Sequence, residues 1–292
     1  MGVGGVQISP LSLVKRVWER IAPLQLAERS WDNVGAMIEA PYPNPEHRRV
    51  LLTIDLTPSV CAEALAQDNV SLIVSYHPPI FSGLKSLTLA DPLQSSLLRL
   101  SAKGISVFSP HTSLDATPNG INTWLVKPFI PFATSHEPLT TSEQPPQGFE
   151  GAGMGRIVRL STHLDVRQVV RMVKEHLGLE HVQLATPAIE KPITSIAVCA
   201  GSGASLFKGV QADLFLTGEM SHHEVLATIA SGSSVILTNH TNTERPYLSQ
   251  VLQPWLEKEL NSEIEMDFHN DSPNGKWEVL VSRADQDPLR VV

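Results

Sequence analysis

Three histidines and two acidic residues carry the chemistry that this sequence is expected to perform. His77, His111 and His240 each come shortly after an apolar run with the composition of a β-strand. Asp115 and Glu244 stand four residues after the second and third of these histidines. Ligand groups of open α/β sheets gather at the carboxyl ends of the strands. We therefore expect the five side chains to converge at one edge.

The combination of imidazole and carboxylate groups predicts a site for one or two divalent metal ions. These ligand types suit Zn, Mn, Fe, Co or Ni better than calcium, and a carboxylate placed between two ions is the usual bridge of a dinuclear site. A single histidine after a strand is more often a loop residue bonded to a carbonyl group. Three such histidines, two of them with an equally spaced acid, favour the metal site.

An internal repeat supports this interpretation. Residues 106–115 and 235–244 both give an apolar strand, a small hydroxyl residue and then His-Thr-x-x-acid. A repeat of this kind indicates a duplicated α/β unit. It predicts two similar α/β domains related by pseudo-two-fold symmetry, with the metal site in the crevice between them.

Short apolar runs that alternate with helical patterns predict the elements around these residues. The cap and period after Ser9-Pro10 indicate an N-terminal helix, and Thr57-Pro58 opens another. The alternation is typical of a mostly parallel sheet with helices on its faces. Strands are expected at 50–54, 71–74, 105–108, 156–160, 195–199, 213–216 and 234–237, and a helix at 166–177.

The periodic pattern stops in a segment rich in Ser, Thr and Pro, which divides the chain. We predict an N-terminal α/β domain over residues 1–130, a linker or long loop over 131–152, and a C-terminal α/β domain over 153–292.

Composition excludes several classes of protein. With 292 residues, 42% of them hydrophobic, the chain is long enough for two globular domains. A net charge of −8 argues against direct binding of nucleic acid. No apolar run approaches the roughly 20 residues that span a bilayer. Cys61 and Cys199 are expected to be buried free thiols, which favours the cytoplasm and leaves nucleus and mitochondrion open.

Weaker signals lie near other predicted strand ends. Asp32 is either a carboxylate that supports a metal ligand or part of an ordinary Asp-Asn-x-Gly turn. One of Glu219, His222 and His223 is expected to face the crevice, and the others to be a cap or surface groups. The segment 201–203 lacks the third glycine of a dinucleotide-binding loop, and no Gly-Lys-Ser/Thr follows it.

These motifs together resemble the NIF-three-like family, the Ngg-interacting-factor-three proteins also named type 2 GTP cyclohydrolase homologues. The resemblance implies two similar α/β domains, a dinuclear metal centre between them and a toroidal homohexamer. It covers nearly the whole chain and rests on residues 30–35, 75–81, 111–115, 153–156, 217–223 and 240–244.

By this resemblance the metal ligands are His77, Asp115, His240 and Glu244, with Glu244 as the bridge and His111 close by. Bacterial members of the family carry two adjacent histidines before the proline. Tyr76 occupies the first of these positions here, as in eukaryotic-looking members. A neutral phenol is a poor ligand near pH 7, which predicts that one of two metal sites is weak or that His111 compensates.

Two classes of function follow. The first is a metal-dependent hydrolase in which His111 transfers protons and Glu244 is required for turnover. Its substrate would be a nucleotide or another small molecule that contains phosphate. The alternative is a non-catalytic metal-binding interaction protein, such as a partner of a transcriptional co-regulator.

Overall fold

Two units, built from interleaved segments of the chain, make up the fold. The computed structural model describes residues 8–189, 191–268 and 275–292. Unit 1 consists of Met1–Ser113 and Leu248–Gln286, and unit 2 of Leu114–Tyr247 and Asp287–Val292. The division falls inside one short helix, so that His111 belongs to unit 1 and Asp115 to unit 2.

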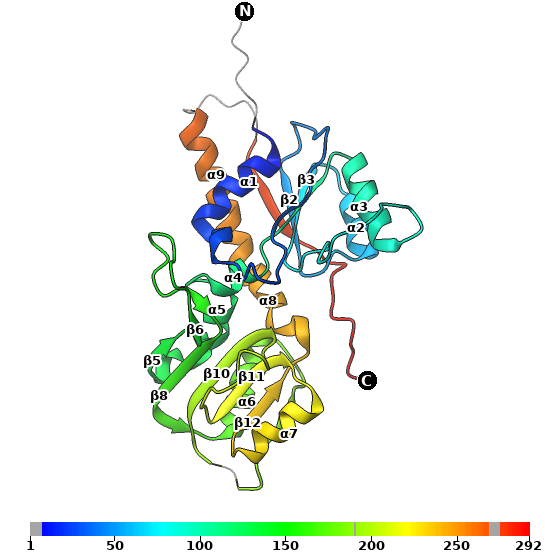
Figure 1. The fold of residues 1–292 in the computed structure, drawn as a ribbon. Helices are drawn as coiled ribbons and strands as arrows, with labels where there is room; N and C mark the ends of the chain where they lie inside the picture. The colour runs from blue at the N-terminus through cyan, green and yellow to red at the C-terminus, as the bar shows by residue number, and fades with distance from the viewer. Residues whose placement is uncertain (1–7, 190, 269–274) are drawn as a thin grey trace, which may run out of the picture. The chain divides into compact units, whose positions relative to one another are not determined.

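Unit 1 is an α/β unit (Figure 1). Its elements, in chain order, are α1 (Pro10–Ile21), η1 (Leu24–Leu26), β1 (Gly35–Ile38), β2 (Arg49–Thr53), α2 (Pro58–Ala66), β3 (Val70–Ser75), α3 (Pro92–Ala102), β4 (Ser106–Ser109), the start of α4 (Thr112–Ala116), the π-helical turn η4 (Leu248–Leu252), α9 (Gln253–Phe268) and β13 (Glu278–Val281).

Unit 2 is also α/β, with more strand than helix. Its elements after the end of α4 are α5 (Ile121–Val126), η2 (Lys127–Phe132), β5 (Ala133–Glu137), β6 (Thr140–Thr141), β7 (Gly153–Met154), β8 (Arg156–Leu164), α6 (Val166–Leu177), β9 (Gln183–Ala185), β10 (Ile193–Ser202), β11 (Leu214–Glu219), α7 (His222–Ala230), β12 (Ser234–Leu237), η3 (His240–Thr243) and α8 (Arg245–Tyr247).

Four strands of each sheet share one topology, β1-β4-β3-β2 in unit 1 and β9-β12-β11-β10 in unit 2. The strand order in unit 1 is β1-β4-β3-β2-β13, and in unit 2 it is β5-β8-β10-β11-β12-β9. In unit 1, β1 pairs antiparallel with β4, the strand before the His-Thr motif, and β3 and β2 follow in parallel. In unit 2, β9 pairs antiparallel with β12, the strand before the second His-Thr motif, and β11 and β10 follow in parallel. This agrees with the duplication that the sequence predicts. Unit 2 adds the antiparallel strands β8 and β5, so its sheet is mixed rather than mostly parallel.

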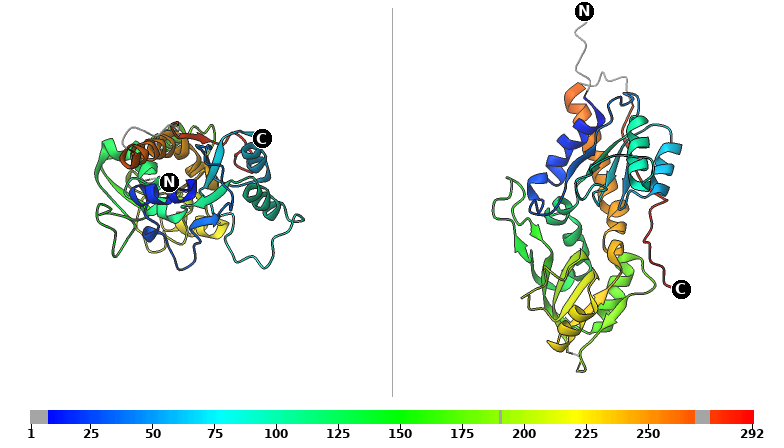
Figure 2. Two further views of the ribbon diagram at one scale, coloured as in Figure 1. Left: turned by 90° about the horizontal axis from the view of Figure 1, so that it is seen from above. Right: turned by 45° about the vertical axis from the view of Figure 1, so that its right-hand side comes forward.

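Helix α1 forms as its sequence predicts. The Ser9 hydroxyl accepts a hydrogen bond from the backbone N–H of Ser12, and Pro10 occupies the first turn, where its missing N–H costs nothing. The apolar residues of its helical period, including Val14, Val17 and Trp18, are fully buried. Helices α1 and α9 lie on one face of the unit 1 sheet and α2 and α3 on the other (Figures 1 and 2).

The division into units differs from the predicted domain boundaries. Residues 131–152, predicted to be a linker or long loop, contain the end of η2 and the strands β5 and β6, and β5 pairs with β8. The Thr and Ser residues of this segment suit an exposed edge strand. The described residues within 248–286, predicted as part of the C-terminal domain, belong to unit 1. There β13 pairs in parallel with β2, which would otherwise be an open edge.

Both cysteines are buried free thiols, as predicted. Among the described residues, no helix combines the length and the apolar character needed to cross a bilayer.

Candidate metal centre

Each of the three predicted histidines lies just beyond the carboxyl end of a strand. His77 follows β3 and His111 follows β4 in unit 1, and His240 follows β12 in unit 2. The backbone turns sharply as it leaves two of these strands, with a φ of 33° at His111 and 69° at Asn239. Few L-residues other than Asn, Asp and His adopt positive φ, so the chain leaves these two strands in an uncommon local conformation.

In unit 1, both histidines are bonded to a carboxylate through Nδ1. The distance from His77 Nδ1 to Asp55 Oδ1 is 2.9 Å, and from His111 Nδ1 to Asp32 Oδ1 it is 2.7 Å. Asp32 also accepts hydrogen bonds from the hydroxyl and the backbone N–H of Thr112. A carboxylate can only accept, so each Nδ1 carries a proton and the lone pair of the neutral ring lies on Nε2.

The rings of unit 1 form one cluster around His111. The ring centroid of His111 lies 5.4 Å from that of His77 and 5.4 Å from that of Tyr76. Trp31 contacts His111 edge-on at a centroid distance of 5.9 Å. The structure therefore brings together the two histidines that the sequence predicts for this half of the chain.

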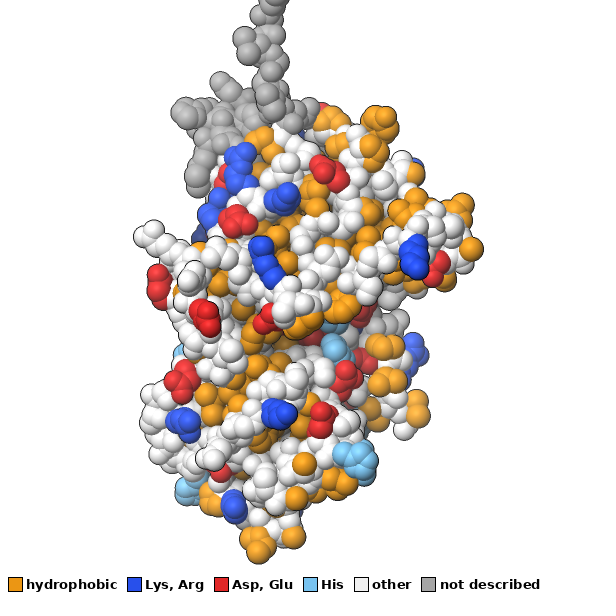
Figure 3. All heavy atoms as spheres, in the orientation of Figure 1, with side chains coloured by type: hydrophobic (Ala, Val, Ile, Leu, Met, Phe, Trp, Pro, Cys, Tyr) orange, Lys and Arg blue, Asp and Glu red, His pale blue; other side chains and the backbone are white. Residues whose placement is uncertain are grey.

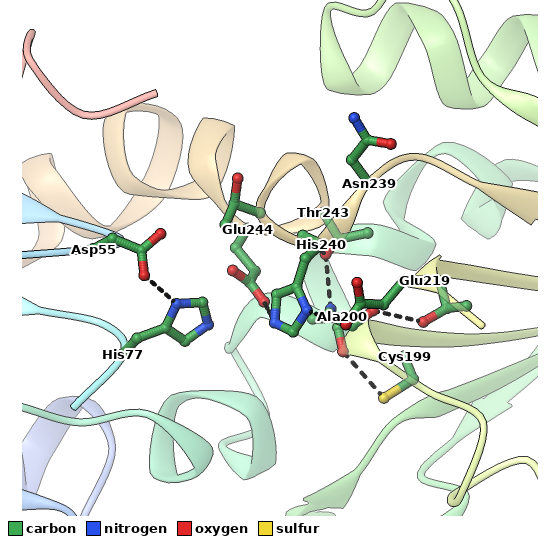
Figure 4. A network of polar contacts seen from close by, with 12 residues as sticks. Asp55, His77, Cys199, Ala200, Glu219, Asn239, His240, Thr243 and Glu244 are labelled. Atoms are coloured by element: carbon green, nitrogen blue, oxygen red, sulfur yellow. Dashed lines mark hydrogen bonds and ion pairs between the residues drawn. The ribbon is translucent and has the colours of Figure 1, made fainter. Parts of the chain in front are cut away.

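In unit 2, His240 repeats the same arrangement (Figure 4). Its Nδ1 lies 2.8 Å from Glu219 Oε1, and its Nε2 lies 3.8 Å from Glu244 Oε1. Glu244 is 1% exposed, whereas His240 is partly exposed. The nitrogen that holds the lone pair of the neutral ring thus lies beside a buried carboxylate, which is a pair of donor atoms that divalent transition metals prefer.

Asp115 and Glu244 are both buried in unit 2. Burial raises the pKa of the Cys199 thiol, and the charges of Asp115 and Glu244 raise it further. Burial lowers the pKa of Arg156 to about 10, and the charge of Asp115 opposes that shift. Both carboxylates therefore act on one region of the interior. Arg156 supplies a positive charge near Asp115, and buried carboxylates are stabilised by such paired charges, by hydrogen bonds or by a metal ion.

The backbone at Gly201 lies close to the side chains of His240 and Glu244, which is possible because glycine has no Cβ atom. With a φ of 62°, it occupies the left-handed region, and its N–H donates to Thr243 Oγ1 at 2.8 Å. A Cβ atom at this position would lie 2.8 Å from His240 Nε2 and 2.9 Å from Glu244 Oε1. The sequence pattern around Gly201 suggests only an incomplete phosphate-binding loop, whereas in the structure this glycine leaves space at the donor atoms of His240 and Glu244.

Of the weaker signals, Asp32 and Glu219 both support a histidine. Asp55 was missed by the sequence analysis, although it stands just beyond the end of β2, the same position relative to a strand that marks the histidines. His222 and His223 are exposed on α7, where Ser221 and Glu224 form the capping box. They have the surface and cap positions that the sequence allowed.

Replacing Asp32 with Asn is expected to lower the free energy of unfolding by about 1.5–3 kcal/mol at pH 7, the range for hydrogen bonds to a charged group. Burial raises the pKa of Asp32, but hydrogen bonds from His111 and Thr112 outweigh it and leave the pKa below its ordinary 3.8. The ionised carboxylate therefore contributes its full stabilisation above about pH 4, and this contribution decreases below 3.8 as the pH falls toward and through the lowered pKa of the folded state. Urea unfolding at pH 7 and pH 3 measures the effect, with the exposed Asp68→Asn as control. A difference between wild type and Asp32→Asn that is equal at both pH values would contradict it.

Fold and site define a class: an α/β protein in which carboxylate-supported histidines follow the strands of a duplicated topology. Residues 10–275 match the family described as Duf34/NIF3 (NGG1p interacting factor 3). The chain belongs to this family, as the sequence resemblance predicted.

Two curated relatives illustrate the match. The chain is 43% identical over 258 residues to a "Protein NIF3 homolog" of Schizosaccharomyces pombe, covering 88% of this chain and 89% of the relative. It is 37% identical over 251 residues to the "NGG1-interacting factor 3" of Saccharomyces cerevisiae, covering 83% and 81%. A Bacillus cereus protein related to NIF3 has the same fold, with a TM-score of 0.76 and 17% identity over 96% of this chain and 98% of that one.

Proposed function

We propose that this protein binds divalent metal and is a metal-dependent hydrolase. The proposal rests on one observation above all: His77, His111 and His240 are each bonded through Nδ1 to a carboxylate. Metal-ligating histidines almost always donate their other ring N–H in this way, which fixes the tautomer and raises the basicity of the ligand nitrogen.

The donor set fits a first-row divalent ion. Within unit 2 the proposed ligands are Asp115, His240 and Glu244. His240 Nε2 and Glu244 Oε1 lie 3.8 Å apart, and Asp115 is proposed from its place in the repeated His-Thr-x-x-acid motif. His77 of unit 1 remains a proposed ligand on the basis of its sequence context and its bond to Asp55. A bound divalent ion would supply Lewis acidity, which would let a water molecule lose a proton near neutral pH and act as the nucleophile.

The protein's own groups would then bind the substrate and move protons. His111 is the proposed proton shuttle, because Asp32 fixes its ring and leaves the lone pair of the neutral ring on Nε2. Glu244 is proposed both as a ligand and as the bridge of a dinuclear centre. A nucleotide or another phosphate-containing small molecule is the proposed substrate class, which rests on the family resemblance.

A screen of phosphate-containing small molecules with metal-loaded protein tests the hydrolase proposal. Turnover is expected to fall by about 100-fold or more in His111→Ala, the usual effect of removing a general acid or base. Glu244→Gln is expected to lose turnover together with metal. His223→Ala removes an exposed histidine from α7 and should leave turnover unchanged. A hydrolysed substrate whose turnover survives His111→Ala would exclude the proposed shuttle.

Tyr76→His is expected to increase the stoichiometry or affinity of metal binding, because imidazole replaces a phenol that must ionise before it binds. Tyr76 is 2% exposed, and its ring lies 4.9 Å from that of His77. Calorimetric titration with Zn²⁺ measures the change, with Tyr42→His as the control because Tyr42 is 88% exposed. Superimposable titration curves for wild type and Tyr76→His would count against this role.

A protein-binding function is the second candidate. The name of the Saccharomyces cerevisiae relative states that it interacts with NGG1. In this chain the loop between β3 and α3 exposes large apolar side chains, and Figure 3 shows hydrophobic groups at the surface beside α3. Exposed apolar patches commonly mark interaction sites. An adaptor of this kind would keep its partner after Glu244→Gln, whereas the hydrolase would lose turnover. The homohexamer implied by the family resemblance stays a prediction for either function.

A further inference from the structure

Two exposed aromatic rings lie side by side next to the Asp32–His111 pair. Trp31 is 53% exposed and Phe81 is 52% exposed, and their ring centroids are 6.2 Å apart with an interplanar angle of 39°. Trp31 also contacts the His111 ring at 5.9 Å. All these residues belong to unit 1. Two adjacent large aromatic side chains therefore expose apolar area to water. Exposed apolar area of this kind indicates a binding surface.

Residues next to Trp31 and Phe81 in the chain form hydrogen bonds that fix the loops carrying these two aromatic side chains. Asp32, which follows Trp31, is bonded to His111 and also accepts from the N–H of Asn33 at 2.7 Å. Asn33 donates its side-chain amide to the carbonyl of Ile80, the residue before Phe81. The loops that carry the two rings are therefore tied to each other and to the histidine. A surface fixed in advance binds a ligand with little ordering cost.

We propose that Trp31 and Phe81 form a stacking platform that binds a flat aromatic ring beside His111. Their separation of 6.2 Å leaves no room for a ring between them, so the ligand lies across the exposed faces. This inference rests on the proposed function, whose substrate it narrows to molecules that contain such a ring. His111 lies beside the platform, with its ring centroid 5.9 Å from that of Trp31. A polar group on the edge of the bound ligand's ring would form a hydrogen bond with His111.

The alternative to a small aromatic ligand is a protein whose apolar side chains pack on Trp31 and Phe81. It would draw on the whole apolar loop, including Leu84, Leu87 and Leu89, which are 41%, 48% and 68% exposed. Those leucines carry no link to His111 among the interactions described. The hydrogen bonds that tie the loops of Trp31 and Phe81 to His111 favour a small ligand that reaches this histidine. Binding of a second copy of this chain is the alternative that the test below distinguishes.

The tryptophan fluorescence of the full-length protein reports on this surface. All five tryptophans lie in the described part of the chain; Trp31 is exposed, Trp255 is half-buried, and Trp18, Trp124 and Trp277 are buried. Benzamide and cyclohexanecarboxamide form a matched pair of probes that differ in the flat ring. Benzamide is expected to quench the fluorescence in a saturable manner, and cyclohexanecarboxamide is not.

Variants assign the quenching to the platform. Phe81→Leu keeps the fluorescent reporter and is expected to weaken benzamide binding about tenfold, the scale of one stacking contact. Phe132→Leu alters another part-exposed phenylalanine, in unit 2, and should have no effect. In ligand-observed NMR, Trp31→Phe should retain binding better than Trp31→Leu. Metal content, measured on the same samples, should not change.

Equal quenching by the two probes, or equal loss in Phe81→Leu and Phe132→Leu, would overturn the platform. A change in sedimentation coefficient in Phe81→Leu with benzamide binding intact would instead assign the surface to contacts between copies of the chain, and would also overturn it. Absence of metal from wild-type protein that still binds benzamide would refute the proposed function alone. The two failures are therefore distinguishable.

Discussion

The double variant His240→Ala, Glu244→Gln is expected to lose most of the divalent metal that the wild-type protein carries after purification. His240 would lose the imidazole nitrogen that lies 3.8 Å from Glu244 Oε1, and the amide of Gln lacks the charge of the buried carboxylate. Even the loss of a group that only supports a ligand costs about 10- to 100-fold in metal affinity, so the loss of two ligands should cost more. Elemental analysis of the purified proteins measures the change.

The fold should survive this double substitution. His240 is partly exposed, and Gln keeps the size of Glu244, so circular dichroism and the unfolding transition are expected to stay close to wild type. His223→Ala, Glu224→Gln changes an exposed histidine and an exposed acid on α7 and serves as the control. Wild-type metal content in the His240→Ala, Glu244→Gln protein would show that the ion binds elsewhere.

Gly201→Ala should lower metal affinity about 10- to 100-fold without touching a proposed ligand. The added methyl group would meet His240 Nε2 at 2.8 Å and Glu244 Oε1 at 2.9 Å. Both contacts are closer than real Cβ atoms tolerate, and both neighbours are ends of side chains. The side chains are therefore expected to move away rather than the backbone to unfold.

Gly209→Ala separates this effect from backbone strain. Gly209 has a φ of 82°, and a Cβ there would meet nothing within 4 Å. Both substitutions force alanine into the left-handed region, at a cost of about 1–2 kcal/mol in stability. Only Gly201→Ala should weaken the binding of Zn²⁺ in a competition titration with a chelator. An equal change in affinity for the two variants would attribute the effect to strain and remove Gly201 from the account of the site.

Local sequence was sufficient to predict the elements whose ends have strong signals. The helix predicted at residues 166–177 has these bounds in the structure, because Asp165 and Gln168 form a capping box and Gly178 takes the left-handed conformation after its end. The predicted C-terminal domain, residues 153–292, wrongly groups β13 with the strands of unit 2. Nothing local in Glu278–Val281 specifies its partner, since pairing of β13 with β2 is a long-range contact.

The candidate site was predictable where a residue carries chemistry and stands at a strand end. That reasoning placed the three histidines at strand ends and identified Asp32 as a possible support. It named Glu219 only as one of three candidates to face the crevice. Asp55 was missed because a lone acid after a strand has no distinctive spacing. The role of Gly201 depends on how closely a distant loop approaches, which spacing along the chain does not encode.

Anomalous X-ray scattering from a crystal of metal-loaded protein tests the central claim most directly. The account predicts an anomalous peak about 2.0–2.1 Å from His240 Nε2, with a carboxylate oxygen of Glu244 at about 2.0–2.2 Å, the usual distances for zinc. Glu219 should remain bonded to His240 Nδ1. A peak on the Nδ1 side of His240, or an ion that contacts neither His240 nor Glu244, would contradict it.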